Sequence, residues 1–140
     1  MKEFGTRLPP LPRGELIILL GETAKRLASD WSVSFDPMRA STGVHPLEVR
    51  AQRAVASGGR NSQMSLVCQM LPFPTGEFEM RVTFEEGSET RESEAAVGAA
   101  MAAIHAGLCW LLGEPPGTPP APNMWGLNRG RWQFGPQFQG

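Results

Sequence analysis

Hydrophobic residues recur at helical spacing along two stretches of the chain. The first stretch has apolar residues at steps of three and four: Leu16, Leu20, Ala24, Leu27 and Trp31. This period predicts an amphipathic helix over residues 13–30, and Pro12 stands where a helix tolerates a missing N–H. The second stretch is the Ala-rich run that begins at Ala95, and it predicts a long helix over residues 89–112 that ends at Gly113.

Strict alternation of apolar and polar residues predicts strands in other parts of the chain. Residues 77–84 alternate most clearly, with Phe, Met, Val and Phe on one face and Glu, Glu, Arg and Thr on the other. Residues 31–35 alternate in the same way, and residues 64–71 are apolar enough for an interior strand. Since turn-forming residues 72–76 separate two of these segments, we expect residues 64–71 and 77–84 to form an antiparallel hairpin.

The region before this hairpin is less regular. Residues 38–45 have the composition of a turn. The sequence LEVRAQRAVA follows His45-Pro46 and precedes Gly58-Gly59, and it favours a short second helix over residues 46–56.

These elements predict an α+β fold, in which a small antiparallel sheet of about three strands packs on two main helices. The strands are residues 31–35, 64–71 and 77–84, and the helices cover one face of the sheet. At 140 residues the chain is long enough for one domain and its tails. We place the single α+β domain at residues 13–112.

Two segments of different composition flank the predicted domain. Residues 1–12 cannot begin a helix before Pro12, and we expect them to form an extended Pro-rich arm. Residues 113–140 hold six Gly and six Pro with aromatic residues among them, and no period is visible in this stretch. We therefore expect a Gly/Pro/aromatic C-terminal arm.

Part of the N-terminal segment, RLPPLPR from Arg7 to Arg13, resembles ligands of SH3 domains. In that family one residue separates the Arg from the Leu-Pro core, whereas here both Arg residues are adjacent to it. The guanidinium would miss its acidic pocket by about 3 Å in polyproline geometry. An extended arm that leads into the first helix explains the same residues with fewer assumptions.

Charge excludes several classes of whole-chain function. The chain has 13 basic and 14 acidic residues, which excludes a histone-like nucleic-acid binder and an acidic DNA mimic. The charges are unevenly spread: residues 1–60 hold nine basic and six acidic residues, and residues 61–114 hold two basic and eight acidic ones. This asymmetry suits head-to-tail self-association, or a domain that folds back on itself.

The compartment follows from Cys usage and from the apolar runs. Two Cys cannot make a disulfide framework. The N-terminus has no apolar core followed by a cleavage site. The apolar run over residues 95–112 is rich in Ala and Gly, contains a His and has acidic flanks, so we interpret it as a core helix rather than a membrane span. We expect a cytoplasmic, soluble protein without a membrane partner.

Two Cys and two His are the candidate metal ligands. His105 and Cys109 are four residues apart on one helix face, a spacing that lets two ligands share a metal. The remaining ligands would be Cys68 on a strand and His45 on a loop, which is not a known zinc pattern. Since Cys is often buried without any metal, we expect core packing instead, and no metal or cofactor.

Motifs for catalysis are absent from the sequence. The chain has no nucleophile elbow, no CxxC pair and no phosphate-binding loop, and it contains two Asp residues in all. We therefore expect a protein that is not an enzyme. A small metal-dependent or Cys-dependent enzyme is an alternative reading.

Nucleic-acid binding has two features in its favour. The predicted order helix, strand, strand, helix over residues 46–112 resembles a double-stranded RNA-binding domain. In that family a Lys-rich start of the last helix grips phosphates, whereas the matching stretch here, SETRESEA, is acidic. The resemblance therefore extends to the scaffold and implies no RNA function. The second feature is a pair of Arg among aromatic residues near the C-terminus, which makes an RNA-associated or ribonucleoprotein subunit the main alternative.

The C-terminal segment also carries the residues that we expect to bind a partner. They are aromatic or Arg residues, the types that dominate protein interfaces: Trp125, Arg129, Arg131, Trp132, Phe134 and Phe138. Aromatic side chains of this kind need cover, either from the parent domain or from another chain. The sequence thus predicts a non-catalytic binding or assembly protein that acts through protein–protein contacts. It would be a homo-oligomer or a subunit of a larger complex, such as a viral particle or a phage-encoded inhibitor.

Overall fold

The computed structural model of the chain describes residues 2–8, 10–41, 47–57, 60–86, 90–112 and 133–134. The helices and strands of this part follow one another in the order β1 (Lys2–Leu8), α1 (Arg13–Leu27), β2 (Ser32–Ser34), α2 (Pro37–Ser41), β3 (Glu48–Ser57), β4 (Arg60–Pro72), β5 (Phe78–Glu85), α3 (Arg91–Leu112) and β6 (Gln133–Phe134).

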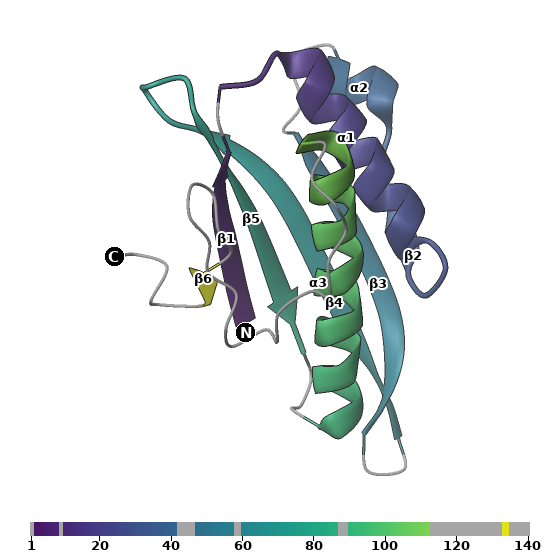
Figure 1. The fold of residues 1–140 in the computed structure, drawn as a ribbon. Coiled ribbons are helices and arrows are strands. Elements are labelled where there is room, and N and C mark those ends of the chain that lie inside the picture. Colours follow the sequence, from purple (N-terminus) through teal and green to yellow (C-terminus); the bar gives the residue numbers. More distant parts are fainter. Residues whose placement is uncertain are drawn as a thin grey trace.

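All strands belong to one antiparallel sheet. Five strands lie in the order β2-β3-β4-β5-β1, and the two-residue β6 pairs with the outer edge of β1. Figure 1 shows α1 and α3 on the same face of this sheet, with α2 beside α1. The α+β class is confirmed, as are the two main helices on one face. The expected number of strands, about three, is wrong, because residues 2–8 and 48–57 also form strands, β1 and β3.

The predicted short helix over residues 46–56 is strand β3. Its apolar side chains are buried at every second position in Val49, Ala51 and Val55, while the side chains between them are half-buried or exposed. Every residue of β3 pairs with β4, from Glu48 opposite Gln69 to Ser57 opposite Arg60. Ala, Arg and Gln favour helices, but here cross-strand pairing and burial with period two decide the conformation.

The N-terminal segment expected as an extended arm contains a strand of the sheet. Every residue of β1 pairs with β5, and Phe4 and Leu8 are almost completely buried. The apolar side chains at positions 4 and 8 share one face of the strand and cover the core beside β5. Residues 1–12 are therefore not an arm outside the domain, because residues 2–8 are part of its sheet.

The other predicted elements are confirmed with shifted ends. The helix predicted at residues 13–30 ends at Leu27, and the helix predicted at 89–112 begins at Arg91. The predicted strands 31–35, 64–71 and 77–84 correspond to β2, β4 and β5, and the last two form the expected antiparallel hairpin. The turn predicted at residues 38–45 is wrong for residues 38–41, which belong to the short helix α2, and residues 42–45 lie outside the described residues.

The core lies between the sheet and the two long helices. Small and medium side chains on one face of α3 are buried at helical spacing in Ala96, Ala100, Ile104 and Leu108. This buried face packs α3 against the sheet, with the short side chains of Ala96 and Ala100 in the first half of the helix. Phe84 of β5 is the centre of an aromatic cluster. Its ring centroid lies 5.9 Å from that of Phe4 and 6.3 Å from that of Trp31.

Local contacts determine where α3 begins and how it meets α1. Thr90 and Ser93 cap the helix reciprocally, since the Ser93 amide donates to Thr90 Oγ1 at 3.1 Å and the Thr90 amide donates to Ser93 Oγ at 2.8 Å. Near its other end, a Cβ on Gly107 would lie 3.6 Å from Thr23 Oγ1 of α1. The two helices therefore pack closely there.

Candidate functional site

The C-terminal residues predicted to bind a partner are only partly within the described structure. Trp125, Arg129, Arg131, Trp132 and Phe138 lie outside the described residues. Phe134 belongs to β6, where its backbone lies opposite Phe4 of β1, and Gln133 lies opposite Gly5. The structure thus brings one of the six predicted contact residues to an edge of the sheet.

Within the described residues, β6 covers only part of the edge of β1. β5 pairs with all seven residues of β1, whereas β6 pairs with two of them. Figure 1 shows β6 beside β1, on the side away from β5. A strand edge presents backbone N–H and C=O groups to any extended segment that approaches it. The arrangement can therefore accept an added strand, which is a common mode of peptide recognition.

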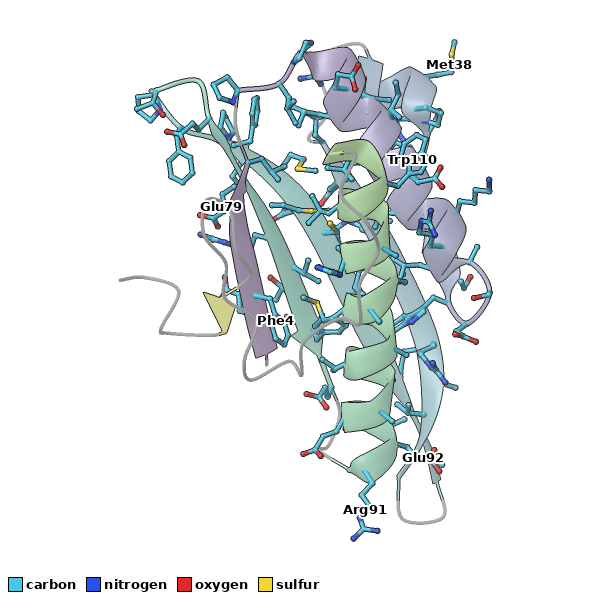
Figure 2. All side chains as sticks on the ribbon, viewed as in Figure 1. Phe4, Met38, Glu79, Arg91, Glu92 and Trp110 are labelled. Carbon is cyan, nitrogen blue, oxygen red and sulfur yellow. The ribbon has the colours of Figure 1, made fainter. Side chains whose placement is uncertain are left out.

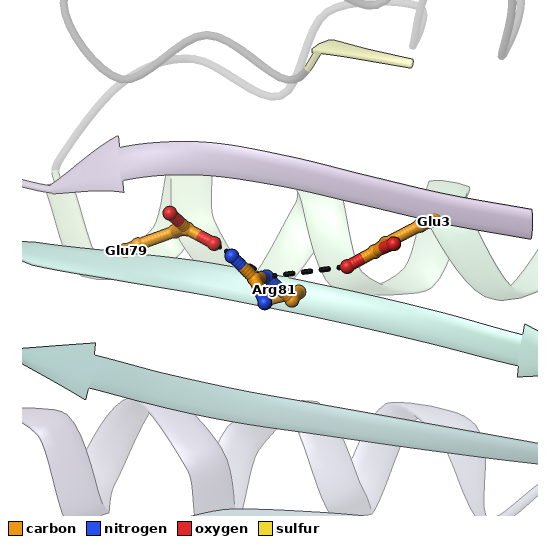
Figure 3. Close-up of polar contacts among 3 residues, drawn as sticks. All are labelled: Glu3, Glu79 and Arg81. Atoms are coloured by element: carbon orange, nitrogen blue, oxygen red, sulfur yellow. Dashed lines mark hydrogen bonds and ion pairs between the residues drawn. The ribbon is translucent and has the colours of Figure 1, made fainter. Parts of the chain in front are cut away.

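An ion cluster connects β1 to β5 on the sheet face opposite the helices (Figure 3). Arg81 Nε lies 2.6 Å from Glu79 Oε1 of the same strand and 3.3 Å from Glu3 Oε1 of β1. Arg81 pairs with Gly5 across the strands, so no side chain at that position of β1 competes with the guanidinium for space. Glu79 is 7% exposed, while Glu3 is half-buried. The cluster stabilises the position of β1 next to β5.

A second strand edge, which the sequence did not predict, lies on the other side of the sheet. β2 pairs with β3 from Arg50 to Gln52, so β3 continues beyond β2 with one side free of a strand in the described structure. The Ala56 amide on this side donates to Glu92 Oε2 of α3 at 3.1 Å. Arg53, also in this part of β3, stacks with its guanidinium carbon 5.6 Å from the ring centroid of Trp31.

This edge was missed because residues 46–56 were predicted as a helix. A signal for the strand is present in the sequence. Two Gly stand between Ser57 and Arg60, which pair across β3 and β4, and Gly-Gly is a typical composition for a two-residue hairpin connection. The bond between Ala56 and Glu92 joins residues 36 positions apart, so no local pattern reveals it.

The candidate metal ligands do not form a site within the described residues. Cys68 is completely buried in β4, and this burial raises the pKa of its thiol to about 12. His105 and Cys109 both belong to α3, and His45 lies outside the described residues. In the part of the chain that the structure describes, no three His, Cys, Asp or Glu side chains are grouped as metal ligands would be. A neutral, enclosed thiol at Cys68 is poorly suited to nucleophilic attack at neutral pH.

Across the described ranges, no helix combines the length and the apolar character that crossing a membrane requires. A scan against protein-family models and a search of curated proteins found no match to this chain. The two sheet edges, at β1 and at β3, are the surfaces of the described structure that could accept a further strand.

Proposed function

We propose that this chain is a non-catalytic binding or assembly protein that acts through protein–protein contacts. Its contact residues are the aromatic and Arg residues of the C-terminal segment, namely Trp125, Arg129, Arg131, Trp132, Phe134 and Phe138. The partner is another protein chain, either a further copy of this one or a subunit of a larger complex.

The observation that supports this proposal is the pairing of β6 with the edge of β1. The C-terminal segment supplies an extended piece of backbone, and β1 supplies an edge on which, in the described structure, β6 pairs with two of seven residues. Backbone pairing gives affinity in this kind of recognition, while side chains beside the strand give specificity.

Within the described residues, β6 and β1 share two residue pairs, which favours a role for a partner. Each backbone hydrogen bond contributes about 1 kcal/mol net, and ordering each residue costs about 1–2 kcal/mol of backbone entropy. Two residue pairs therefore give little net stability by themselves. Burial of Trp and Phe side chains against another chain would supply much more, because each aromatic side chain buries a large apolar area.

The test compares the full chain with a variant that ends at Glu114 and with the double variant Trp125→Ala, Trp132→Ala. Gln137→Ala, Gln139→Ala is the matched control, since it changes two polar residues of the same segment. Light scattering measures the number of copies in the native particle, and pull-down with each of the four proteins as bait measures partner binding. We expect the truncated variant and the double Trp variant to lose copies or binding, and the control to keep both. The same number of copies and equal binding in all four proteins would contradict the proposal.

A further inference from the structure

The part of β3 that extends beyond β2, residues 53–57, is a free segment at the edge of the sheet opposite to β1 and β6. β2 pairs with β3 from Arg50 to Gln52, so residues 53–57 of β3 have no strand on that side in the described structure. Because the Ala56 amide donates to Glu92, it points away from β4. In an antiparallel strand, the N–H and C=O groups of every second residue point to the same side. Those of Ala54 therefore face the same edge as those of Ala56. Both Ala54 and Ala56 are exposed, and their methyl groups leave room for another strand.

Opposite charges flank this edge. Glu92, in the first turn of α3, is exposed and lies beside the end of β3, as Figure 2 shows. Arg53 is half-buried against Trp31, and its Nε is enclosed without a hydrogen-bond acceptor among the described residues. Arg53 lies three residues before Ala56, the residue that Glu92 contacts, so the acidic and the basic group stand near opposite ends of the free segment.

We propose that two copies of this chain pair through this edge, with residues 53–57 of one copy antiparallel to the same residues of the other. In such a pairing Ala54 of one copy lies opposite Ala56 of the second copy. Antiparallel pairing also brings Arg53 of each copy to the end of the segment where Glu92 of the other copy stands. The arrangement has a two-fold axis, so it closes at two copies.

The distribution of charge is the reason for choosing a second copy as the occupant. In a two-fold pairing through the free segment, Arg53 of each copy lies near Glu92 of the other copy. The dimer therefore has two Arg–Glu contacts between the chains. Glu92 covers one amide of the edge in the single chain, which is a usual way to keep an exposed edge from unspecific pairing. In the dimer the same carboxylate turns to the Arg53 of the second copy.

The first arm of the test blocks the edge in the full chain. Ala54→Pro removes an N–H that faces away from β4, so the ladder between β3 and β4 keeps its hydrogen bonds. Ala54→Lys is a second blocking variant that retains the N–H, and Ala54→Ser is the matched control. Sedimentation equilibrium over a range of concentrations measures the dimer constant, and circular dichroism checks the fold. We expect dimerisation to weaken at least about tenfold in Pro and Lys variants and to stay unchanged in the Ser variant.

The second arm exchanges the charges. Arg53→Glu and Glu92→Arg should each weaken dimerisation, and the double variant should recover most of it, since the two charges then attract again. A wild-type chain that stays monomeric at every concentration would overturn the proposal, and so would folded Ala54 variants that all dimerise like the wild type. If truncation after Glu114 abolishes association and Ala54→Lys does not, the proposed role of the C-terminal segment stands and the β3 interface fails.

Discussion

Arg81 contacts two carboxylates that differ in their exposure to water. The side chain of Glu79 is 9% exposed and that of Arg81 is 36% exposed, with 2.6 Å between Nε and Oε1. The buried carboxylate of Glu79 needs the positive charge of Arg81 nearby, because an unpaired buried charge strongly destabilises the folded state. Since Arg81 is partly exposed, water would replace some of the lost interaction.

We therefore expect Arg81→Ala to lower the free energy of unfolding by about 2 kcal/mol. Arg50→Ala is the matched control, because Arg50 also contacts a Glu of its own strand, at 3.3 Å from Glu48, but its side chain is 62% exposed. The control should change the free energy of unfolding by no more than about 0.5 kcal/mol. Urea denaturation measures both values, and equal effects would show that burial of Glu79 has no energetic role.

Cys68 predicts a dependence of stability on alkaline pH. Burial raises the pKa of its thiol from 9.0 to about 12, so below pH 9 the thiol is protonated in both the folded and the unfolded chain. Between pH 9 and about 12 the unfolded chain ionises while the folded chain does not, so the contribution of the protonated thiol is lost as pH rises.

The measurement is the difference in free energy of unfolding between the wild type and Cys68→Ala. This difference should fall by about 1 kcal/mol when the pH is raised from about 8 to about 10, because ionisation of the thiol in the unfolded chain is then no longer matched in the folded chain. Subtracting the variant removes the titration of all other groups. A difference that does not change with pH would mean that the Cys68 thiol reaches water in the folded protein.

At the scale of elements, the turn between β4 and β5 depends on one glycine. Gly76 has a φ of +92°, and its N–H donates to the carbonyl of Phe73 at 3.0 Å. The Phe73 amide donates in turn to the carbonyl of Glu77 at 2.9 Å, so the turn is closed by two backbone hydrogen bonds. A side chain is disfavoured at this φ even though a Cβ on Gly76 would meet no atom within 4 Å.

Gly76→Ala should lower the free energy of unfolding by about 1–2 kcal/mol, through backbone strain alone. Gly14→Ala is the control: a Cβ there also has open space, but Gly14 lies in the first turn of α1, where alanine is favoured. The control should be neutral or slightly stabilising. Thermal unfolding followed by circular dichroism checks both variants, and a Gly76→Ala protein as stable as the control would show that the turn adapts.

The elements that could be predicted from the sequence are those in which period and composition agree. In α1, α3 and β5, apolar spacing and intrinsic propensity favour the same structure. In β3 they conflict, because helix-forming residues carry a strand pattern, and pairing with β4 decides between them. The candidate site follows the same division. Composition points to the aromatic C-terminal segment, whereas the edge of β3 depends on which of its residues pair with β2, which is a property of the whole sheet.

At the scale of the whole molecule, the N-terminal strand β1 completes the sheet by pairing with β5. β1 pairs with β5, about 80 residues later in the sequence, so no local signal identifies its partner. The prolines that follow β1 suggested an extended arm, but they only end the strand before α1 begins. Phe4, labelled in Figure 2, is completely buried, and its ring centroid lies 5.9 Å from that of Phe84.

The strand and the arm make opposite predictions for Phe4. As a buried aromatic residue of β1, Phe4 should contribute strongly to the stability of the folded protein. Phe4→Ala should therefore lower the free energy of unfolding by about 3–5 kcal/mol. In an arm outside the domain the same change would be nearly neutral, as surface substitutions usually are. Phe4→Leu is the matched control, because it keeps most of the apolar volume and should cost less than half as much. Urea denaturation distinguishes these outcomes. A strong loss for Ala with a small loss for Leu requires that the N-terminal strand, and with it the edge that accepts β6, is part of the folded domain.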